Sequence, residues 1–101
     1  MDAPKLLRVL LNTPGMLRTI GVYDPLTARM AEQVGFEAVW VSGNSLAAGL
    51  LGLPDLGLVS FGEVRDHVRR IVQAVGIPVL VDADNGYGNP LNVIRTVREM
   101  E

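Results

Sequence analysis

The stretch VLVDADNGYGN, residues 79–89, joins a short apolar run to two carboxylates and a glycine-rich turn. An apolar run of this length, bounded by turn residues, is typical of a buried β-strand. Side chains alternate across a strand, so Asp82 and Asp84 are predicted to project the same way with the small Ala83 between them. Two like charges in one place favour a cation, and Mg²⁺ prefers carboxylate oxygens while keeping several waters. The stretch therefore predicts a magnesium site, with Mn²⁺ as the alternative ion.

The composition is that of one domain with a hydrophobic core. The 101 residues are 49% hydrophobic with a formal net charge of -2, which argues against binding to a nucleic-acid backbone. No cysteine is present, so disulfides, thiolate zinc sites and cysteine nucleophiles are excluded for these residues. Neither an export signal nor a membrane span is predicted, because the apolar run at residues 46–53 is short and ends at Pro54. We expect a cytoplasmic protein without nucleic-acid or membrane partners.

Strand and helix patterns alternate along the chain. A leading amphipathic helix is predicted over residues 2–11, and three strand-to-helix units follow it. The predicted strands cover residues 18–23, 37–42 and 77–81, and the helices begin at Asp24-Pro25, Ser60 and Asn89-Pro90. The segment between residues 43 and 57 is expected to be a long loop with room for a turn of helix. This repeat predicts an α/β fold with a parallel sheet, whose strands all end at one rim.

Apolar residues recur along each predicted helix at the spacing of one buried face. They are Leu6, Leu7, Leu10 and Leu11 in the first helix, Leu26, Met30 and Val34 in the second, Val64, Val68, Ile71, Val72 and Val75 in the third, and Ile94, Val97 and Met100 in the last. Ser60 and Glu63 have the spacing of a capping box, and Gly35 and Gly76 are expected to stop the helices before them.

Polar residues follow each predicted strand. Tyr23 comes after the first strand, and Ser42 and Gly43 come after the second, while Asp55 lies in the long loop that leaves the same rim. A serine hydroxyl and a bare glycine N–H can bind a carboxylate without adding a bulky charge. The rim therefore predicts a metal facing an anion-binding cradle, and a small anionic carboxylate as the substrate.

Several of these residue types also have structural roles. Asp24 precedes a proline at a helix start and is expected to act first as a helix cap. His67, the only histidine, lies inside a predicted helix and is expected to be a surface or packing residue. Trp40 at the middle of a predicted strand is expected in the core. Asp82 and Asp84 have no such capping duty, which favours the site interpretation for them.

Four segments together resemble the isocitrate lyase/phosphoenolpyruvate mutase superfamily. They are residues 21–29 (GVYDPLTAR), 41–43 (VSG), 51–55 (LGLPD) and 81–89 (VDADNGYGN). The resemblance runs from about Pro14 to the last residue. It implies a (β/α)8 barrel that binds Mg²⁺ and a 2-oxo acid or its enolate, and that cleaves a carbon–carbon or phosphorus–carbon bond.

The resemblance also implies roles for individual residues. Asp82 would ligate the metal directly, while Asp84 and Asp55 would hold metal-bound waters. Ser42 and Gly43 would bind the substrate carboxylate, with Tyr23 lining the pocket. The chain departs from the family pattern at two positions: Asn44 replaces a small residue and is expected to narrow the substrate pocket, and Asn85 replaces a threonine.

The resemblance further implies what lies outside this sequence. Family members supply a metal-shell glutamate from the fourth strand and, in the lyases, a cysteine from a later loop, and this chain ends before both. A complete barrel has about 250 residues, so residues 1–101 are expected to form one partial barrel segment of three βα units and a leading helix, truncated at its C-terminal end. Bare sheet edges would favour a homo-oligomer.

Three functions remain open at this point. The first is cleavage like that of 2-methylisocitrate lyase or oxaloacetate decarboxylase, because the sequences of Asp24-Pro25 and of residues 92–97 resemble those two groups. Phosphonate chemistry like that of phosphoenolpyruvate mutase is the alternative within the family. A non-catalytic partial barrel that associates with itself is the second. A small doubly wound domain that uses the two aspartates in phosphoryl chemistry is the third, although three strands are few for it and no matching lysine follows.

Overall fold

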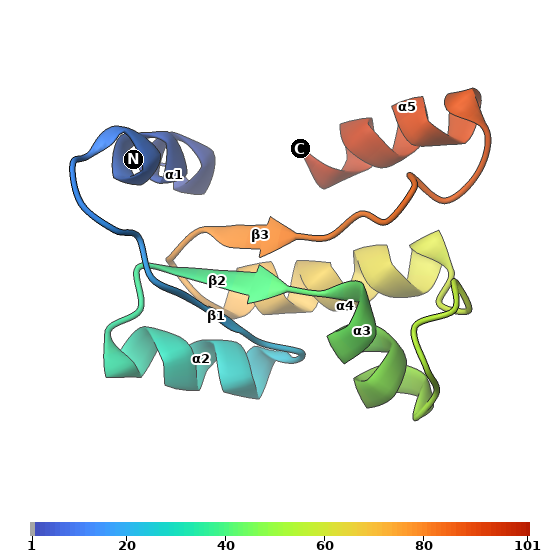
Figure 1. Ribbon diagram of the computed structural model, residues 1–101, viewed down its shortest axis with the longest axis horizontal. Helices are drawn as coiled ribbons and strands as arrows, with labels where there is room; N and C mark the ends of the chain where they lie inside the picture. Colours follow the sequence, from blue (N-terminus) through green and yellow to red (C-terminus); the bar gives the residue numbers. More distant parts are fainter. Residues whose placement is uncertain (1) are drawn as a thin grey trace.

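The computed structural model describes residues 2–101 as alternating strands and helices (Figure 1). In chain order the elements are α1 (Ala3–Asn12), β1 (Thr19–Gly21), α2 (Pro25–Val34), β2 (Ala38–Val41), α3 (Gly43–Leu46), η1 (Ala47–Leu51), α4 (Phe61–Ala74), β3 (Val79–Val81) and α5 (Pro90–Met100). The predicted leading helix and the alternation of strands with helices are confirmed.

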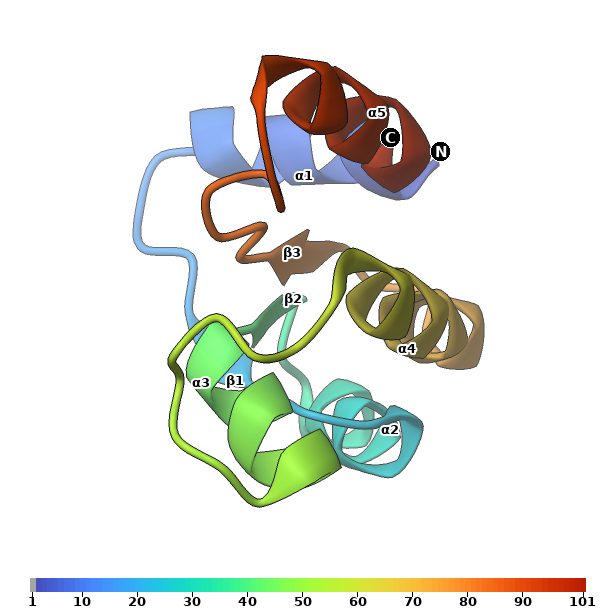
Figure 2. The same cartoon turned by 90° about the vertical axis from the view of Figure 1, so that its right-hand side faces the viewer.

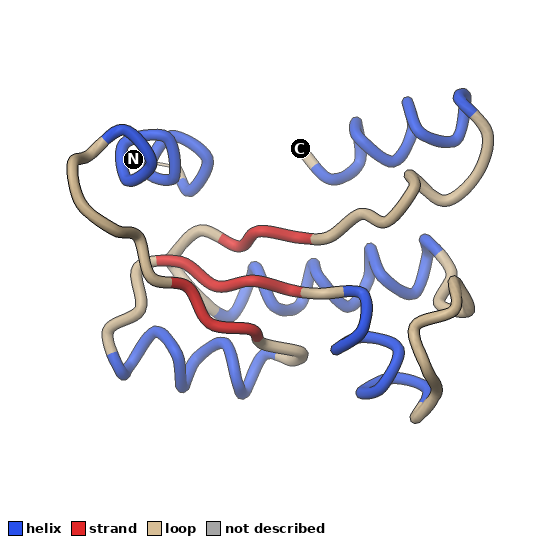
Figure 3. The backbone as a smooth tube through the Cα atoms, viewed as in Figure 1, coloured by secondary structure: helices blue, strands red, loops and turns tan. Residues whose placement is uncertain are grey.

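The strands form a parallel sheet in the order β1-β2-β3, with the strands side by side in Figure 3. Ile20 of β1 pairs with Val39 of β2, and Trp40 of β2 pairs with Leu80 of β3. All three strands are shorter than predicted, and each outer strand pairs only with β2, which has four residues. The predicted parallel order is confirmed, and it brings the ends of all three strands to one side.

The core lies between the sheet and the helices α2 and α4, which cover the same face of it (Figure 2). Its buried residues are Val22, Ala28, Ala31, Val39, Val41, Leu46, Val64, Val68 and Ile71. The predicted buried face of α4 is confirmed at three of its five positions. Val72 is exposed, and Val75 lies just after the helix with an extended backbone. The capping box is confirmed, because Ser60 Oγ accepts from the Glu63 amide and Glu63 Oε1 accepts from the Ser60 amide.

The predicted buried face of α2 was wrong. Leu26, Met30 and Val34 are all exposed, whereas Ala28 and Ala31 are buried. Small side chains allow a helix to approach its neighbours closely, so the alanine face packs against the sheet and α4 and the larger residues turn outward. Met30 and Val34 instead line an apolar groove beside the free edge of β1. In α5 the predicted face is only partly confirmed, because Ile94 and Val97 are exposed whereas Met100 packs against the core.

The second face of the sheet has little cover. Among residues 2–101, no helix lies over it apart from α3 and η1 at the strand ends (Figure 2). Val39 and Val41 point towards the helices, so Trp40 between them points the other way and is 39% exposed. The prediction of Trp40 as a core residue was therefore wrong for this chain. The accessible surface is 6763 Å², against about 5,600 Å² for a compact monomer of this mass.

The expected long loop after β2 is mostly helical. Ser42 caps α3, which continues directly into the π-helical turn η1, and Gly52 ends it in a left-handed conformation with φ 63°. Leu46 and Ala47 are buried at the junction. Small residues with one buried leucine can pack as a helix against the strand ends, which an apolar loop could not do without leaving backbone groups unpaired.

The leading helix α1 packs loosely. Residues 3–12 include none that is buried, although Asp2 caps the helix by accepting from the Lys5 amide. α1 and α5 both lie beyond β3, on the side of the sheet away from β1 (Figures 1 and 2). Across residues 2–101, the structure has no helix with the length and apolar character that a bilayer crossing requires.

Replacement of Ile71 with alanine tests the position of the core. Ile71 is fully buried between α4 and the sheet, so its truncation should lower the free energy of unfolding by about 2–5 kcal/mol. The matched control is Val72→Ala on the same helix, where the side chain is 47% exposed and the change should be about 0.5 kcal/mol or less. Urea denaturation of both variants measures the difference, and equal effects would contradict this core.

Candidate functional site

The loops that leave β1, β2 and β3 lie at the same end of the sheet (Figure 1). Tyr23 follows β1, Gly43 follows β2, and Asp82 follows β3. The amide of Asp82 still donates to the Val41 carbonyl at 2.9 Å, so the pairing of β3 with β2 continues up to the first aspartate. The predicted rim of polar residues is therefore present in the structure.

Asp82 and Asp84 are close for a reason other than the one predicted. The strand ends at Val81, and Asp84 has a left-handed backbone with φ 49°, so strand alternation does not extend to it. Instead, Asp82 Oδ1 accepts a hydrogen bond of 2.8 Å from the Asp84 amide. Oδ1 of Asp82 thus shapes the turn, although Asp82 was expected to have no capping duty, and Oδ2 takes no part in this hydrogen bond.

The turn that follows is fixed by the start of α5. Asn89 caps this helix as predicted. A Cβ at Gly86 would lie 2.5 Å from Val93 Cγ2, and one at Gly88 would lie 2.4 Å from Asn92 Oδ1, so both positions require glycine. Thr96, 2% exposed, donates from Oγ1 to the Gly86 carbonyl at 2.7 Å. The glycine-rich turn is therefore held against α5, and the aspartates before it are held with it.

Asp55 returns from the long connection to the end of β2. Both of its carboxylate oxygens lie 3.5 Å from the point where a Cβ on Gly43 would stand. Asp55, Asp84, Gly43 and Tyr87 share a depression of about 20 Å³ over an apolar floor, which is room for a water molecule or a small ion. The structure thus brings together two of the predicted acidic residues and the predicted glycine.

Tyr87 is a site residue that the sequence alone did not reveal. Its ring packs against Phe61 with centroids 5.6 Å apart. Burial raises the pKa of its phenol above the ordinary value, and the negative charges of Asp84, Asp82 and Asp55 raise that pKa further. The electrostatic effect of all three carboxylates therefore converges on the Tyr87 phenol. The signal in the sequence was the GYG turn next to the aspartates, which was interpreted only as part of a family motif.

The donor set fits a hydrated cation better than a fully protein-ligated one. Within residues 2–101, no three His, Cys, Asp or Glu side chains are close enough to hold one ion directly. Among the ion pairs of the same residues, none involves Asp55, Asp82 or Asp84, so their charges are not balanced by a lysine or arginine. Mg²⁺ is usually bound by one or two carboxylates and keeps several waters.

The predicted anion cradle coincides with the beginning of α3. Ser42 Oγ accepts from the Ser45 amide at 3.0 Å and lies 2.7 Å from Ser45 Oγ, so this hydroxyl is engaged in capping. Gly43 is the first residue of α3, and the first N–H groups of a helix have no intrahelical acceptor. Asn44 occupies the second position. The backbone of Gly43 is thus better placed than the Ser42 hydroxyl to bind an anion.

Tyr23 lies at the rim with 48% of its surface exposed. Its ring is 3.5 Å from the point where a Cβ on Gly49 would stand. Asp24, next to it, caps α2 as predicted, with Oδ1 accepting from the Thr27 amide at 2.7 Å. His67 on α4 was expected only on the surface or in packing, and it forms a hydrogen bond between Nε2 and the Tyr23 carbonyl.

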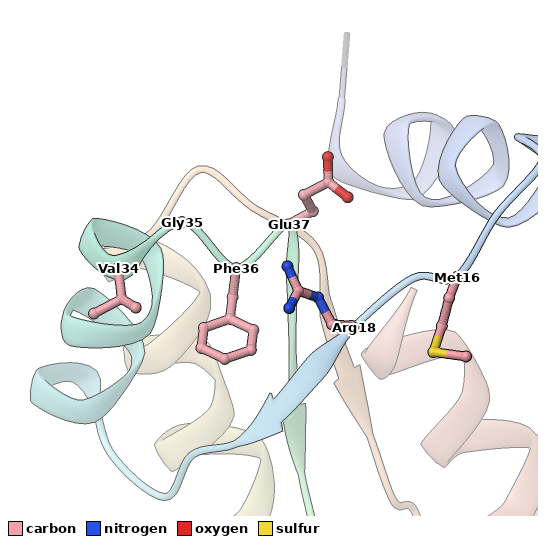
Figure 4. A pocket seen from close by; sticks show the side chains of 6 residues that line it. All are labelled: Met16, Arg18, Val34, Gly35, Phe36 and Glu37. Carbon is pink, nitrogen blue, oxygen red and sulfur yellow. The ribbon is translucent and has the colours of Figure 1, made fainter.

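A larger cavity lies at the opposite end of the sheet (Figure 4). It has a volume of about 510 Å³ and is lined by Met16, Arg18, Val34, Gly35, Phe36 and Glu37. Arg18 precedes β1 and Glu37 precedes β2, so this cavity is at the beginning of the strands. Sites of parallel α/β folds lie at the other end, where the strands finish. Size alone therefore does not identify the site.

The chain matches a family model described as phosphoenolpyruvate phosphomutase over residues 7–101. It is 45% identical over 95 residues to an oxaloacetate decarboxylase of Rhodopseudomonas palustris, covering 94% of this chain and 33% of that protein. It is 43% identical to the 2,3-dimethylmalate lyase of Eubacterium barkeri, covering 100% of this chain and 35% of that protein. The chain therefore spans about a third of the length of these curated relatives.

Solved structures show the same likeness. Oxaloacetate acetylhydrolase superposes with a TM-score of 0.90 at 39% identity, over 97% of this chain and 35% of that one. Phosphonopyruvate hydrolase in complex with oxalate and Mg²⁺ superposes with a TM-score of 0.91 at 33% identity, over 98% of this chain and 35% of that one. The parallel sheet and its helices thus have the arrangement found in these enzymes.

Replacement of Asp84 with asparagine tests the convergence of charge on Tyr87. Loss of this negative charge should lower the phenol pKa towards 10.0, although burial should keep it above that value. The experiment is an ultraviolet titration of tyrosinate in a Tyr23→Phe background, so that only Tyr87 ionises. The control Asp66→Asn, on the exposed side of α4, should leave the titration unchanged, and no shift in the Asp84 variant would contradict this geometry.

Proposed function

Because the chain belongs to the phosphoenolpyruvate mutase/isocitrate lyase superfamily of enzymes, we propose that it forms the first part of a Mg²⁺-dependent (β/α)8 barrel lyase. The proposed reaction cleaves a carbon–carbon bond of a small 2-hydroxy or 2-oxo di- or tricarboxylate. The observation that carries the proposal is the group formed by Asp55, Asp82 and Asp84, three carboxylates without a basic partner among residues 2–101, at the strand ends of a sheet shared with these enzymes.

In this proposal the acidic residues divide the work of holding the ion. Asp82 would ligate the ion directly, since the turn uses only its Oδ1, and Asp84 and Asp55 would hold the ion through water. The assignment agrees with the lack of a cluster of three direct ligands within the described residues. Mn²⁺ has similar ligand preferences and is the alternative ion.

The proposed substrate is a small anion bound beside the metal. Asp55 lies against Gly43, so a substrate carboxylate at the Gly43 N–H would be repelled unless a cation stood between them. In this proposal Asn44, next to Gly43, would narrow one side of the substrate pocket and Tyr23 would line another. Oxaloacetate acetylhydrolase has been solved with 3,3-difluorooxalacetate and with oxalate, which are anions of this size.

The chemistry depends on negative charge that develops as the bond breaks. A bound Mg²⁺ would supply Lewis-acid stabilisation of the enolate oxygen. The chain's own groups hold the reactants in position: the Gly43 N–H binds the carboxylate, and the turn that Thr96 fixes keeps Asp82 and Asp84 in place. The same arrangement would serve phosphonate chemistry, which is the alternative because the chain is also 40% identical to a phosphoenolpyruvate phosphomutase of Streptomyces platensis.

Replacement of Asp82 with alanine tests the proposal. In the protein that carries the complete barrel, this variant should weaken Mn²⁺ binding by at least about tenfold and abolish Mg²⁺-dependent turnover. Binding is measured by electron paramagnetic resonance, and turnover with oxaloacetate, 2-methylisocitrate, 2,3-dimethylmalate and phosphonopyruvate, so that the panel separates lyase from phosphonate activity. Asp66→Ala is the control and should retain both properties. Unchanged turnover in the Asp82 variant would defeat the assignment.

A second candidate is a partial barrel that associates with itself. The observation in its favour is the accessible surface of 6763 Å², about 1,200 Å² above that of a compact monomer; a typical stable interface buries about 800 Å² on each partner. Trp40 lies on the poorly covered face, with Leu80 paired beside it on the same face. Among the described residues, β1 and β3 are the outer strands of the sheet, and their outer edges can pair with a strand of another copy.

Sedimentation equilibrium of residues 1–101 tests this candidate. We expect a dimer or larger species, with the fluorescence of Trp40, the only tryptophan, moving to shorter wavelength as concentration rises and the ring is buried. Trp40→Lys should shift the equilibrium towards the monomer, whereas Arg70→Lys on the exposed surface of α4 should not. A monomer at every concentration would exclude self-association.

A further inference from the structure

His67 connects two elements that are far apart in the sequence. It lies on α4, and its Nε2 is hydrogen-bonded to the backbone carbonyl of Tyr23, 44 residues earlier. The carbonyl belongs to the loop between β1 and α2 at the rim of the sheet. A helix that packs against α2 on the covered face of the sheet thus reaches the end of β1 with one side chain.

The same loop is held from its other side by α2. Thr27 Oγ1 accepts from the Tyr23 amide at 3.2 Å and from the Asp24 amide at 3.3 Å. The N–H of Tyr23 is therefore bonded to one helix and its C=O to another. With both peptide groups tied, the backbone of Tyr23 has little freedom to rotate, and the direction in which its side chain leaves the backbone is fixed.

The ring of Tyr23 has a third constraint. Gly49 of η1 presents bare backbone to it, and Tyr23 Cδ2 lies 3.5 Å from the point where a Cβ on Gly49 would stand. About half of the side chain remains exposed at the rim. The ring is thus supported on one side and open on the other, which is the arrangement of a residue that lines a binding site.

The geometry points to His67 as a positioning residue that orients Tyr23 towards the substrate pocket. This inference rests on the proposed function, in which Tyr23 lines that pocket. A carbonyl oxygen only accepts hydrogen bonds, so Nε2 of His67 must carry the hydrogen in this contact. His67 acts through the Tyr23 backbone and does not itself touch the substrate.

Two substitutions separate the hydrogen bond from packing. His67→Gln keeps an N–H donor at similar reach, whereas His67→Leu keeps apolar volume and removes the donor. Gln73→Leu is the matched control, since it makes a polar-to-leucine change at an exposed position of the same helix. A residue that only fills space would tolerate leucine at least as well as glutamine.

The first measurement is made on residues 1–101 by NMR and needs no activity. Long-range ¹H–¹⁵N spectra of the unsubstituted chain should show hydrogen on Nε2 of His67, and nuclear Overhauser effects should join the Tyr23 ring to the Gly49 Hα atoms. These Overhauser effects should disappear in His67→Leu and persist in His67→Gln and Gln73→Leu. A neutral ring with hydrogen on Nδ1 would overturn the inference even if the leucine variant does not fold.

The second measurement is made on the protein that carries the complete barrel. His67→Leu should raise KM about tenfold with kcat within about twofold, because a pocket-lining side chain contributes to binding of substrate and transition state alike; His67→Gln should restore KM. Equal effects of both variants, or an unchanged KM in a variant whose Tyr23 ring no longer lies against Gly49, would overturn the inference. Absence of Mg²⁺-dependent turnover in the unsubstituted enzyme would instead defeat the proposed function, leaving the NMR result to decide whether His67 orients Tyr23.

Discussion

Parallel pairing of β1 and β3 with β2 is the constraint on which the proposed site depends. Parallel strands joined by helices must end on the same side of the sheet, so Tyr23, Gly43 and Asp82 leave their strands at one rim. Val39 and Val41 hold the strands together, because their buried side chains pack against the two covering helices. The segments at the rim contribute Val22 and Leu46 to this core, and their remaining positions can carry polar residues.

The rim concentrates negative charge that the described residues do not neutralise. Asp55, Asp82 and Asp84 all disfavour ionisation of the Tyr87 phenol, and none has a lysine or arginine partner among residues 2–101. Such an arrangement attracts a cation, because a positive charge between neighbouring carboxylates interacts favourably with all of them. The proposed divalent ion would balance these charges, and it would also allow an anionic substrate to lie beside Asp55.

The uncovered surface follows from the same strand pairing. Parallel strands are apolar on both faces because both are normally covered, and here helices cover one face while Trp40 is exposed on the other. The large residues of α2 that face outward lie beside the free edge of β1. The uncovered apolar face and the proposed site thus both follow from the parallel pairing of the three strands.

Local signals in the sequence determined the order of the elements and where the helices begin. The caps at Asp24 and Ser60 bond to residues only three positions away, so both partners are visible in a short window of sequence. The sequence also placed the aspartates at a strand end. Only the tertiary structure decided that the glycine-rich turn is held against α5 through Thr96, that Tyr87 joins the acidic group and that His67 reaches the first loop. These outcomes depend on how distant helices pack against the sheet, and the spacing of residues along the chain carries no information about that packing.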